Sequence, residues 1–129
     1  MAEYDGQHFD PPAPVAMVSL GTVDRVRHVT NVRMLIDTGA DVTLIPRSCA
    51  EPLGLLEQTD AVFHLQGYDG ADATVEAVEA RLFFLGQGYC GTFPLIDDDC
   101  GILGRNILNR LSLVFDGPNL KWREAARND

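Results

Sequence analysis

The chain has 129 residues, of which 46% are apolar, and a formal charge of −9 at pH 7. This length and apolar content predict one folded domain with a real core and exclude an intrinsically disordered chain. The negative charge argues against nucleic acid or an anionic membrane surface as a partner.

Three features of the sequence indicate the cellular compartment of the protein. The N-terminal residues are polar and contain prolines, unlike a secretory signal, and no run approaches the roughly 18 apolar residues of a membrane span. Cys49, Cys90 and Cys100 are odd in number and have no CxxC spacing. Free thiols in a reducing compartment are the simplest account, so we expect a cytoplasmic protein.

Most of the chain is predicted to be β-strand, because short alternating segments are separated by turn residues. The predicted strands are, in chain order, residues 14–22, 26–36 with a break near Thr30 and Asn31, 41–46, 61–65, 74–85, 89–96, 111–115 and 120–123. Residues 47–53 are expected to form one helical turn closed by Gly54, and residues 105–110 one short C-terminal helix. Many short strands with regular turns predict a closed or folded-over all-β structure.

The ends of the chain are expected to lie outside this structure. Residues 1–13 should form a flexible N-terminal arm, residues 14–123 the folded domain and residues 124–129 a frayed tail.

A carboxylate follows directly on the strand predicted over residues 26–36. The two apolar residues before Asp37 should bury that strand and hold the carboxylate on rigid backbone. Thr38 adds a hydroxyl, Gly39 lacks a Cβ so that another chain can approach closely, and Ala40 keeps the next position small. This order of residues predicts a catalytic loop.

A second segment complements the first. Ile102 and Leu103 are apolar and Gly104 follows them, which suits a chain that passes very close beside a catalytic loop. Arg105 then begins the predicted C-terminal helix. The two segments are therefore expected to meet in the folded domain.

Together these segments resemble the active site of the retropepsin-like aspartic proteases, and the resemblance extends over about residues 15–122. It implies a retropepsin-like closed β structure of the non-viral, bacterial or cellular type, and hydrolysis of peptide bonds without a metal or other cofactor. The family's chemistry needs two such aspartates and the chain holds one, so the domain would be half of a two-fold symmetric homodimer. The resemblance also implies that Thr38 crosses the dimer interface and that Asp41 pairs with Arg105.

The mechanism implied by the resemblance depends on two like charges. As in known aspartic-protease dyads, the two Asp37 carboxylates would lie about 3 Å apart, too close for both to ionise, and would share one proton. The ionised member would activate a water that attacks the substrate carbonyl. The alternative function is a retropepsin-fold module that dimerises and binds peptides but cleaves them poorly. The intact Asp-Thr-Gly sequence favours the endopeptidase.

One further segment is assigned by the same resemblance. Gly67, Tyr68, Asp69 and Gly70 lie between two predicted strands and are expected to form a flap over the cleft, with an ordinary hairpin turn as the alternative.

The C-terminal part departs from the viral pattern. Viral retropepsins end soon after the helix, with a strand that joins an interdigitated dimer sheet, whereas this chain continues through a further hairpin. We expect that hairpin to contribute to the subunit interface, with Phe115 and Trp122 as its apolar anchors. Alternatively, Trp122 only caps the core of the monomer.

Other clusters favour structural roles. The acidic run over residues 97–99 is expected to be a solvated turn and not a metal site, because consecutive strand residues point to opposite faces. The cysteines are expected to be small, at least partly buried thiols and not nucleophiles. By resemblance alone, Val42, Leu44, Ile45 and Ile102 would supply apolar subsites.

Overall fold

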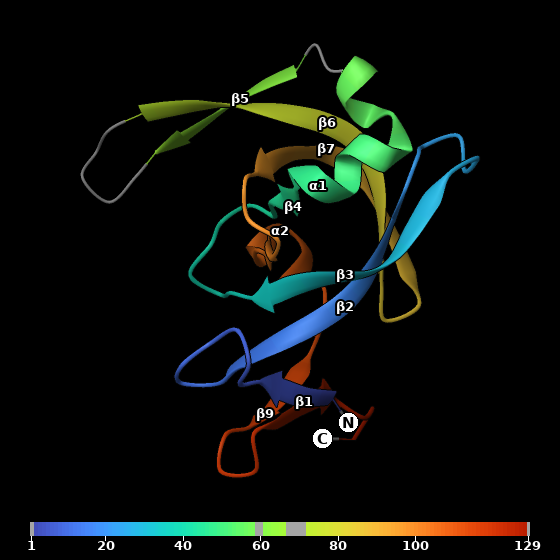
Figure 1. Cartoon of the computed structure of the whole chain (residues 1–129). Helices are drawn as coiled ribbons and strands as arrows, with labels where there is room; N and C mark the ends of the chain where they lie inside the picture. The colour runs from blue at the N-terminus through green and yellow to red at the C-terminus, as the bar shows by residue number, and fades with distance from the viewer. Residues whose placement is uncertain (1, 59–60, 67–71, 129) are drawn as a thin grey trace.

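The computed structural model describes the backbone of residues 2–58, 61–66 and 72–128 and the side chains of residues 2–56 and 75–128 (Figure 1). Within these ranges the chain is mostly β-strand. The strands are β1 (Ala2–Asp5), β2 (Ala13–Gly21), β3 (His28–Ile36), β4 (Ile45–Pro46), β5 (Ala61–Gln66), β6 (Asp72–Phe84), β7 (Gln87–Ile96), β8 (Gly101–Leu103), β9 (Leu113–Asp116) and β10 (Lys121–Glu124). The helical segments are α1 (Arg47–Ala50), η1 (Glu51–Leu53), η2 (Leu55–Gln58) and α2 (Arg105–Leu108).

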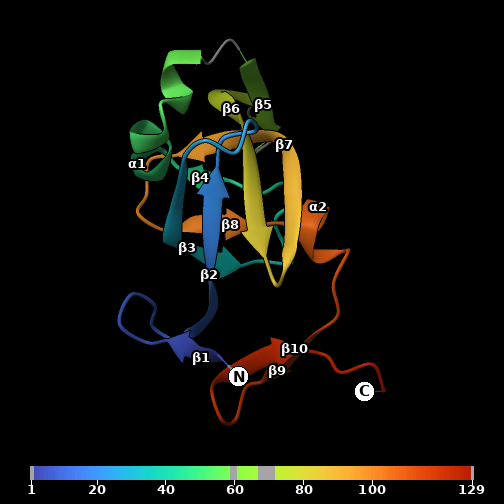
Figure 2. The same cartoon turned by 90° about the vertical axis from the view of Figure 1, so that its right-hand side faces the viewer.

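The long strands form one strongly curved sheet. Antiparallel pairs join β2 to β3, β2 to β6, β5 to β6 and β6 to β7, while β3 with β8 and β4 with β7 are parallel. Figure 2 shows β2, β6 and β7 side by side, with β3 and β8 beside them around a common interior. Inward side chains such as Leu20, Met34, Leu82 and Leu103 are fully buried there. The predicted folded-over all-β structure is confirmed.

The break expected in the second long strand is a β-bulge. The pairing of β2 with β3 shifts between Val18 and Leu20, and Asn31 adopts a φ of 56°. Asparagine tolerates this left-handed conformation better than most residues, so it suits the extra residue of a bulge. The strand nevertheless continues to Ile36, which keeps the residues before Asp37 in register.

The predicted short helical segments are present. Residues 47–53 form α1 and η1, and Gly54, at a φ of 72°, ends them with its N–H donating to the Glu51 carbonyl over 3.0 Å. The C-terminal helix α2 ends at Leu108, two residues before the predicted Arg110. No helix in the described ranges is long and apolar enough to cross a membrane.

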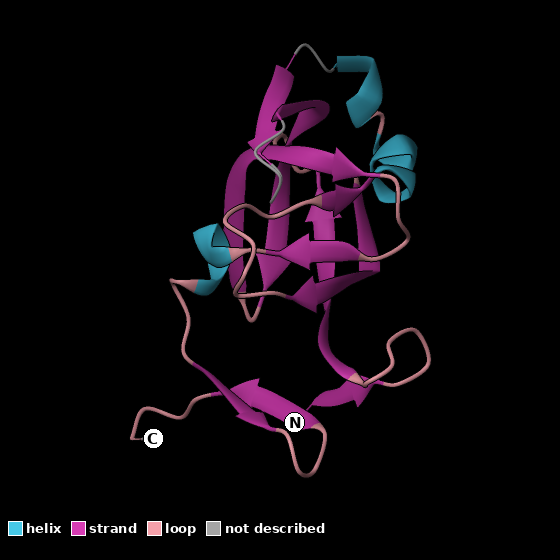
Figure 3. Ribbon diagram, turned by 90° about the vertical axis from the view of Figure 1, so that its left-hand side faces the viewer, coloured by secondary structure: helices cyan, strands magenta, loops and turns pink. Residues whose placement is uncertain are grey.

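The strands at the two ends of the chain, here called the terminal sheet, continue the main sheet beyond β2, which differs from the predicted flexible arm. β1 pairs with β10 through Ala2 and Trp122 and with β2 through Tyr4 and Pro14. Figure 3 shows these strands, near the N and C labels, below the main body. The prediction is wrong for β1 because one of its two partners, β10, lies at the other end of the chain, where no local pattern reveals it.

Trp122 attaches this terminal sheet to the main core. Its side chain is buried, its ring centroid lies 6.0 Å from that of Phe84, and its Nε1–H donates to the Val15 carbonyl over 3.2 Å. The alternative in which Trp122 caps the monomer core is therefore confirmed, and its expected role as an interface anchor is wrong. Phe115, on the neighbouring strand, remains 42% exposed.

Candidate active site

Asp37 lies where β3 ends, and its loop is folded around its own carboxylate. The Asp37 N–H donates to the Leu103 carbonyl over 3.1 Å, and Asp37 Oδ1 accepts the Gly39 N–H over 2.9 Å. The Ala40 N–H donates to the Asp37 carbonyl over 3.2 Å. These bonds hold the carboxylate in one orientation while Thr38 and Gly39 remain exposed.

The second predicted segment passes directly beside this loop. β8 pairs in parallel with the end of β3, placing Ile102 opposite Leu35 and Leu103 opposite Ile36. On the other side of β8, Leu44 and Ile102 exchange two backbone hydrogen bonds of 2.9 Å. β8 is thus held between the strand that enters the Asp37 loop and the chain that leaves it.

Glycine is required at both ends of β8. A Cβ at Gly101 would lie 2.6 Å from the Leu44 carbonyl oxygen, and one at Gly104 would overlap the Val42 carbonyl. These distances are too short for any real Cβ contact, so the backbone would have to move. The close approach of another backbone segment expected at Gly104 is confirmed, and that segment is the one that contains Val42.

A buried threonine joins the two segments. The Thr43 side chain is fully buried, and its hydroxyl donates to Asn106 Oδ1 over 2.7 Å and accepts the Gly104 N–H over 3.0 Å. Neither Thr43 nor Asn106 is singled out by the sequence motifs. The available signal is a lone hydroxyl within the apolar run from Val42 to Ile45.

Arg105 ties the loop to α2 through a different acceptor from the one predicted. Its Nη1 donates to the Thr38 carbonyl over 2.8 Å, and its backbone N–H donates to the Ala40 carbonyl over 2.8 Å. The predicted ion pair with Asp41 is wrong: the side chain of Asp41 is exposed, and no ion pair of the described residues includes it. The Arg105 guanidinium donates to the Thr38 carbonyl instead.

The predicted flap, Gly67–Gly70, lies outside the described residues. β5 and β6 lead to it, with Gln66 paired to Asp72 at the last described position. In Figure 1 these strands and the loop between β3 and β4 both extend to the left of the molecule.

A cavity of about 320 Å³ lies beside the strand that carries Asp37. Leu35, Ile102, Phe9 and Cys100 are among the residues that line it. The lining includes Ile102 but no residue of the loop over residues 37–40. Ile45 is not available as a subsite residue, because its side chain is fully buried in the core.

The cysteines and the acidic run behave as structural elements. Burial raises the pKa of the Cys49 and Cys100 thiols, which favours the protonated, unreactive form. Cys90 is exposed, contrary to the prediction of partial burial. The acidic residues 97–99 form the predicted solvated turn, in which Arg47 Nε donates to Asp97 Oδ1 over 2.7 Å. The described residues contain no group of three or more His, Cys, Asp or Glu that could hold a metal.

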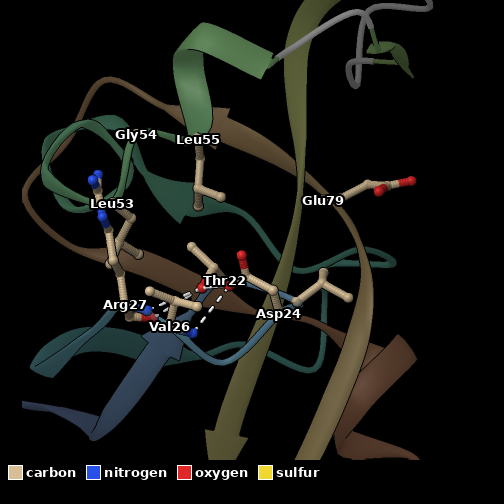
Figure 4. Close-up of a pocket in the computed structure, with 9 residues that line it drawn as sticks. Thr22, Asp24, Val26, Arg27, Leu53, Gly54, Leu55 and Glu79 are labelled. Atoms are coloured by element: carbon tan, nitrogen blue, oxygen red, sulfur yellow. Dashed lines mark hydrogen bonds between the residues drawn. The ribbon is translucent and has the colours of Figure 1, made fainter.

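A larger cavity, of about 600 Å³, lies at the opposite end of β3 (Figure 4). It is formed by the β2–β3 turn against η1 and η2, and the Thr22 hydroxyl accepts the Arg27 N–H there over 3.1 Å. Nine strand residues at roughly 3.3 Å each separate this end of β3 from Asp37. The cavity therefore has no part in the chemistry of the Asp37 loop.

Comparison with known proteins agrees with this geometry. Residues 19–106 match the model of a family described as aspartyl protease. Among solved structures, the EIAV protease complexed with the inhibitor HBY-793 is similar, with a TM-score of 0.54, 20% sequence identity, and coverage of 76% of this chain and 86% of that chain. At this identity the likeness establishes the shared retropepsin fold. A comparison with curated proteins found no match.

Proposed function

Since the chain belongs to the aspartyl protease family, we propose that it is an aspartic endopeptidase whose active site forms when two copies meet. The observation that carries the proposal is the Asp37 loop, whose carboxylate is fixed by the Gly39 N–H while its tip is exposed. One chain supplies one such carboxylate, and the reaction needs two. A homodimer with both loops at its two-fold axis provides the second.

The chemistry follows from the meeting of two carboxylates. At close range they cannot both be ionised, so the pair holds one proton. The ionised Asp37 takes a proton from a water, which attacks the carbonyl carbon of the peptide bond. The protonated Asp37 stabilises the developing oxyanion, and a proton then passes to the leaving nitrogen. No covalent intermediate is formed.

The residues around the loop have positioning roles in this proposal. Arg105 fixes the loop through the Thr38 carbonyl, and Thr43 fixes β8 through Gly104. Both contacts lie within one subunit, so each half of the site is prepared before the subunits meet. Preorganisation of this kind reduces the reorganisation needed in the transition state.

The test is cleavage of a mixed peptide library by purified protein between pH 3 and pH 7. We expect cleavage that is blocked by a statine-type transition-state mimic and lost in Asp37→Ala. Activity should fall on the alkaline side as the shared proton is lost, and in strong acid as both carboxyls become protonated. A folded dimer that binds peptides but cleaves none at any pH would contradict the proposal.

A further inference from the structure

The cavity at the end of β3 remote from Asp37 has a rigid wall, the turn between β2 and β3. The Thr22 N–H donates to the Arg27 carbonyl over 3.0 Å, and the Thr22 hydroxyl donates to Asp24 Oδ1. The same carboxylate oxygen accepts the Val26 N–H over 3.0 Å. These bonds fix the backbone around Val26 and Arg27, so both side chains extend from a preformed frame.

The cavity also has apolar walls that remain partly in water. Leu53 and Leu55, from η1 and η2, are buried, and Figure 4 shows Leu55 extending from η2 toward the turn. Val23 and Val26 line the same cavity but are 51% and 74% exposed. Covering such side chains with a ligand is favourable, and about 600 Å³ lies within the usual range of small-molecule sites.

Arg27 supplies a positive charge that has no ion-pair partner among the described residues. Its side chain is exposed, and a Cβ at Gly54 would lie only 3.2 Å from its Nη1, so a larger residue there would crowd the guanidinium. In Figure 4 the guanidinium lies at the left, beside Gly54 and Leu53. A guanidinium next to apolar side chains is suited to bind a carboxylate of a ligand.

Two carboxylates lie on the other side of the cavity. Asp24 and Glu79 are to the right of Arg27 in Figure 4, with the Glu79 carboxylate directed outward at the edge. Ionised carboxylates only accept hydrogen bonds, so a ligand that extends past them needs N–H donors as well as an anionic end. An alkyl carboxylic acid provides only the anionic end. A peptide with a free C-terminal carboxylate provides both.

We infer that this cavity is a second binding site, separate from the Asp37 loop, for short peptides that have apolar side chains and a free C-terminal carboxylate. Arg27 binds the carboxylate, Val26 and Leu55 contact the apolar side chains, and Asp24 and Glu79 accept N–H groups at the mouth. The choice of ligand rests on the proposed function, because hydrolysis of a peptide bond leaves a new C-terminal carboxylate on one product. The site itself lies within one chain and needs no partner subunit.

Calorimetric titration with trileucine and with its C-terminal amide tests the role of Arg27. The amide should bind the wild type about 10-fold more weakly, as for loss of a charged hydrogen bond, and Arg27→Gln should weaken binding of the free acid by a similar factor. The amide should lose no further affinity for Arg27→Gln, because the two changes remove the same contact. The matched control is Arg25→Gln, since Arg25 is exposed on the same turn but does not line the cavity. This control should bind trileucine like the wild type.

Three further measurements locate the site and define its ligand. In nuclear magnetic resonance spectra of the wild type, trileucine should shift the amide signals of Val26, Arg27 and Gly54 and leave that of Gly39 in place. A statine-type mimic bound at the Asp37 loop should not displace trileucine. Octanoate, which has a carboxylate and an apolar chain but no N–H groups, should bind more weakly than trileucine.

The second site would be overturned by an absence of binding at millimolar trileucine, by displacement with the statine-type mimic, or by equal binding of trileucine to the Arg27→Gln and Arg25→Gln variants. Octanoate that binds as tightly as trileucine would overturn the assignment to peptides. Failure of the proposed function gives a different result, namely a protein that cleaves no peptide but still binds trileucine through Arg27.

Discussion

Thr43 and Asn106 lie 63 positions apart in the sequence and are joined by a hydrogen bond of 2.7 Å. Thr43 follows the Asp37 loop, and Asn106 lies in the first turn of α2. Because the same hydroxyl also accepts the Gly104 N–H, the bond fixes β8 and α2 against the chain that leaves the loop. This contact therefore adds a side-chain link to the backbone bonds that already join the two halves of the motif.

Replacing Thr43 by Val should lower the free energy of unfolding by about 1–3 kcal/mol, because the buried Gly104 N–H loses its acceptor and the side-chain oxygen of Asn106 loses the hydroxyl that donates to it. Chemical denaturation measures this change. Thr43→Ser keeps the hydroxyl and should recover most of the stability. A larger loss in Thr43→Ser than in Thr43→Val would mean that the methyl group, and not the hydrogen bonds, is what matters.

Gly104→Ala, at a buried glycine, should destabilise the protein more than an alanine substitution at an exposed turn glycine. The new Cβ would overlap the Val42 backbone, and small-to-large changes without room cost about 1–3 kcal/mol. Gly117→Ala is the matched control, since a Cβ there would meet no atom within 4 Å. Similar melting temperatures for the two variants would contradict the close crossing of β8 and the Val42 segment.

Arg105→Gln should lower kcat/KM strongly while it changes the free energy of unfolding little. The variant loses the bond from Nη1 to the Thr38 carbonyl, a contact of a charged donor for which about 1.5–3 kcal/mol corresponds to roughly 10–150-fold in rate. Arg47→Gln removes a surface arginine that pairs with Asp97 and Glu76, and should leave kcat/KM unchanged. Equal reductions of kcat/KM in the two variants would contradict a positioning role of Arg105.

Stability should depend on pH through Asp5. The backbone N–H of His8, which bonds to its carboxylate, is the main cause that lowers the pKa of Asp5 below its ordinary value of 3.8. A lowered pKa in the folded state stabilises the protein above the ordinary value, and this contribution is lost as the pH falls through the lowered pKa. The melting temperatures of wild type and Asp5→Asn should differ at pH 7 and converge below about pH 4. A constant difference down to pH 2.5 would contradict this.

The long strands and the Asp37 loop are predictable from the sequence because their signals are local. Apolar alternation predicts β2, β3 and β6. The residue types around Asp37 indicate a catalytic loop, and those around Gly104 indicate a close crossing of two chain segments. The helical turn closed by Gly54 is predicted for the same reason, since a glycine marks its left-handed end.

The remaining features depend on contacts between distant segments. β1 is a strand because β10 is beside it, and β8 has only three residues, whose pairing depends on β3. Trp122 is buried because Phe84 and Val15 cover it, and Arg105 binds the Thr38 carbonyl because the fold brings that carbonyl closer than Asp41. Local patterns carry no information on such distances.

The most direct test of the shared site is to mix the wild type with increasing amounts of Asp37→Asn at concentrations where both form dimers. If one site is built from two copies of Asp37, each mixed dimer is inactive, and the activity per wild-type chain falls toward zero as the variant is added in excess. If that activity stays constant at every ratio, each chain works with a site of its own and the shared pair is refuted.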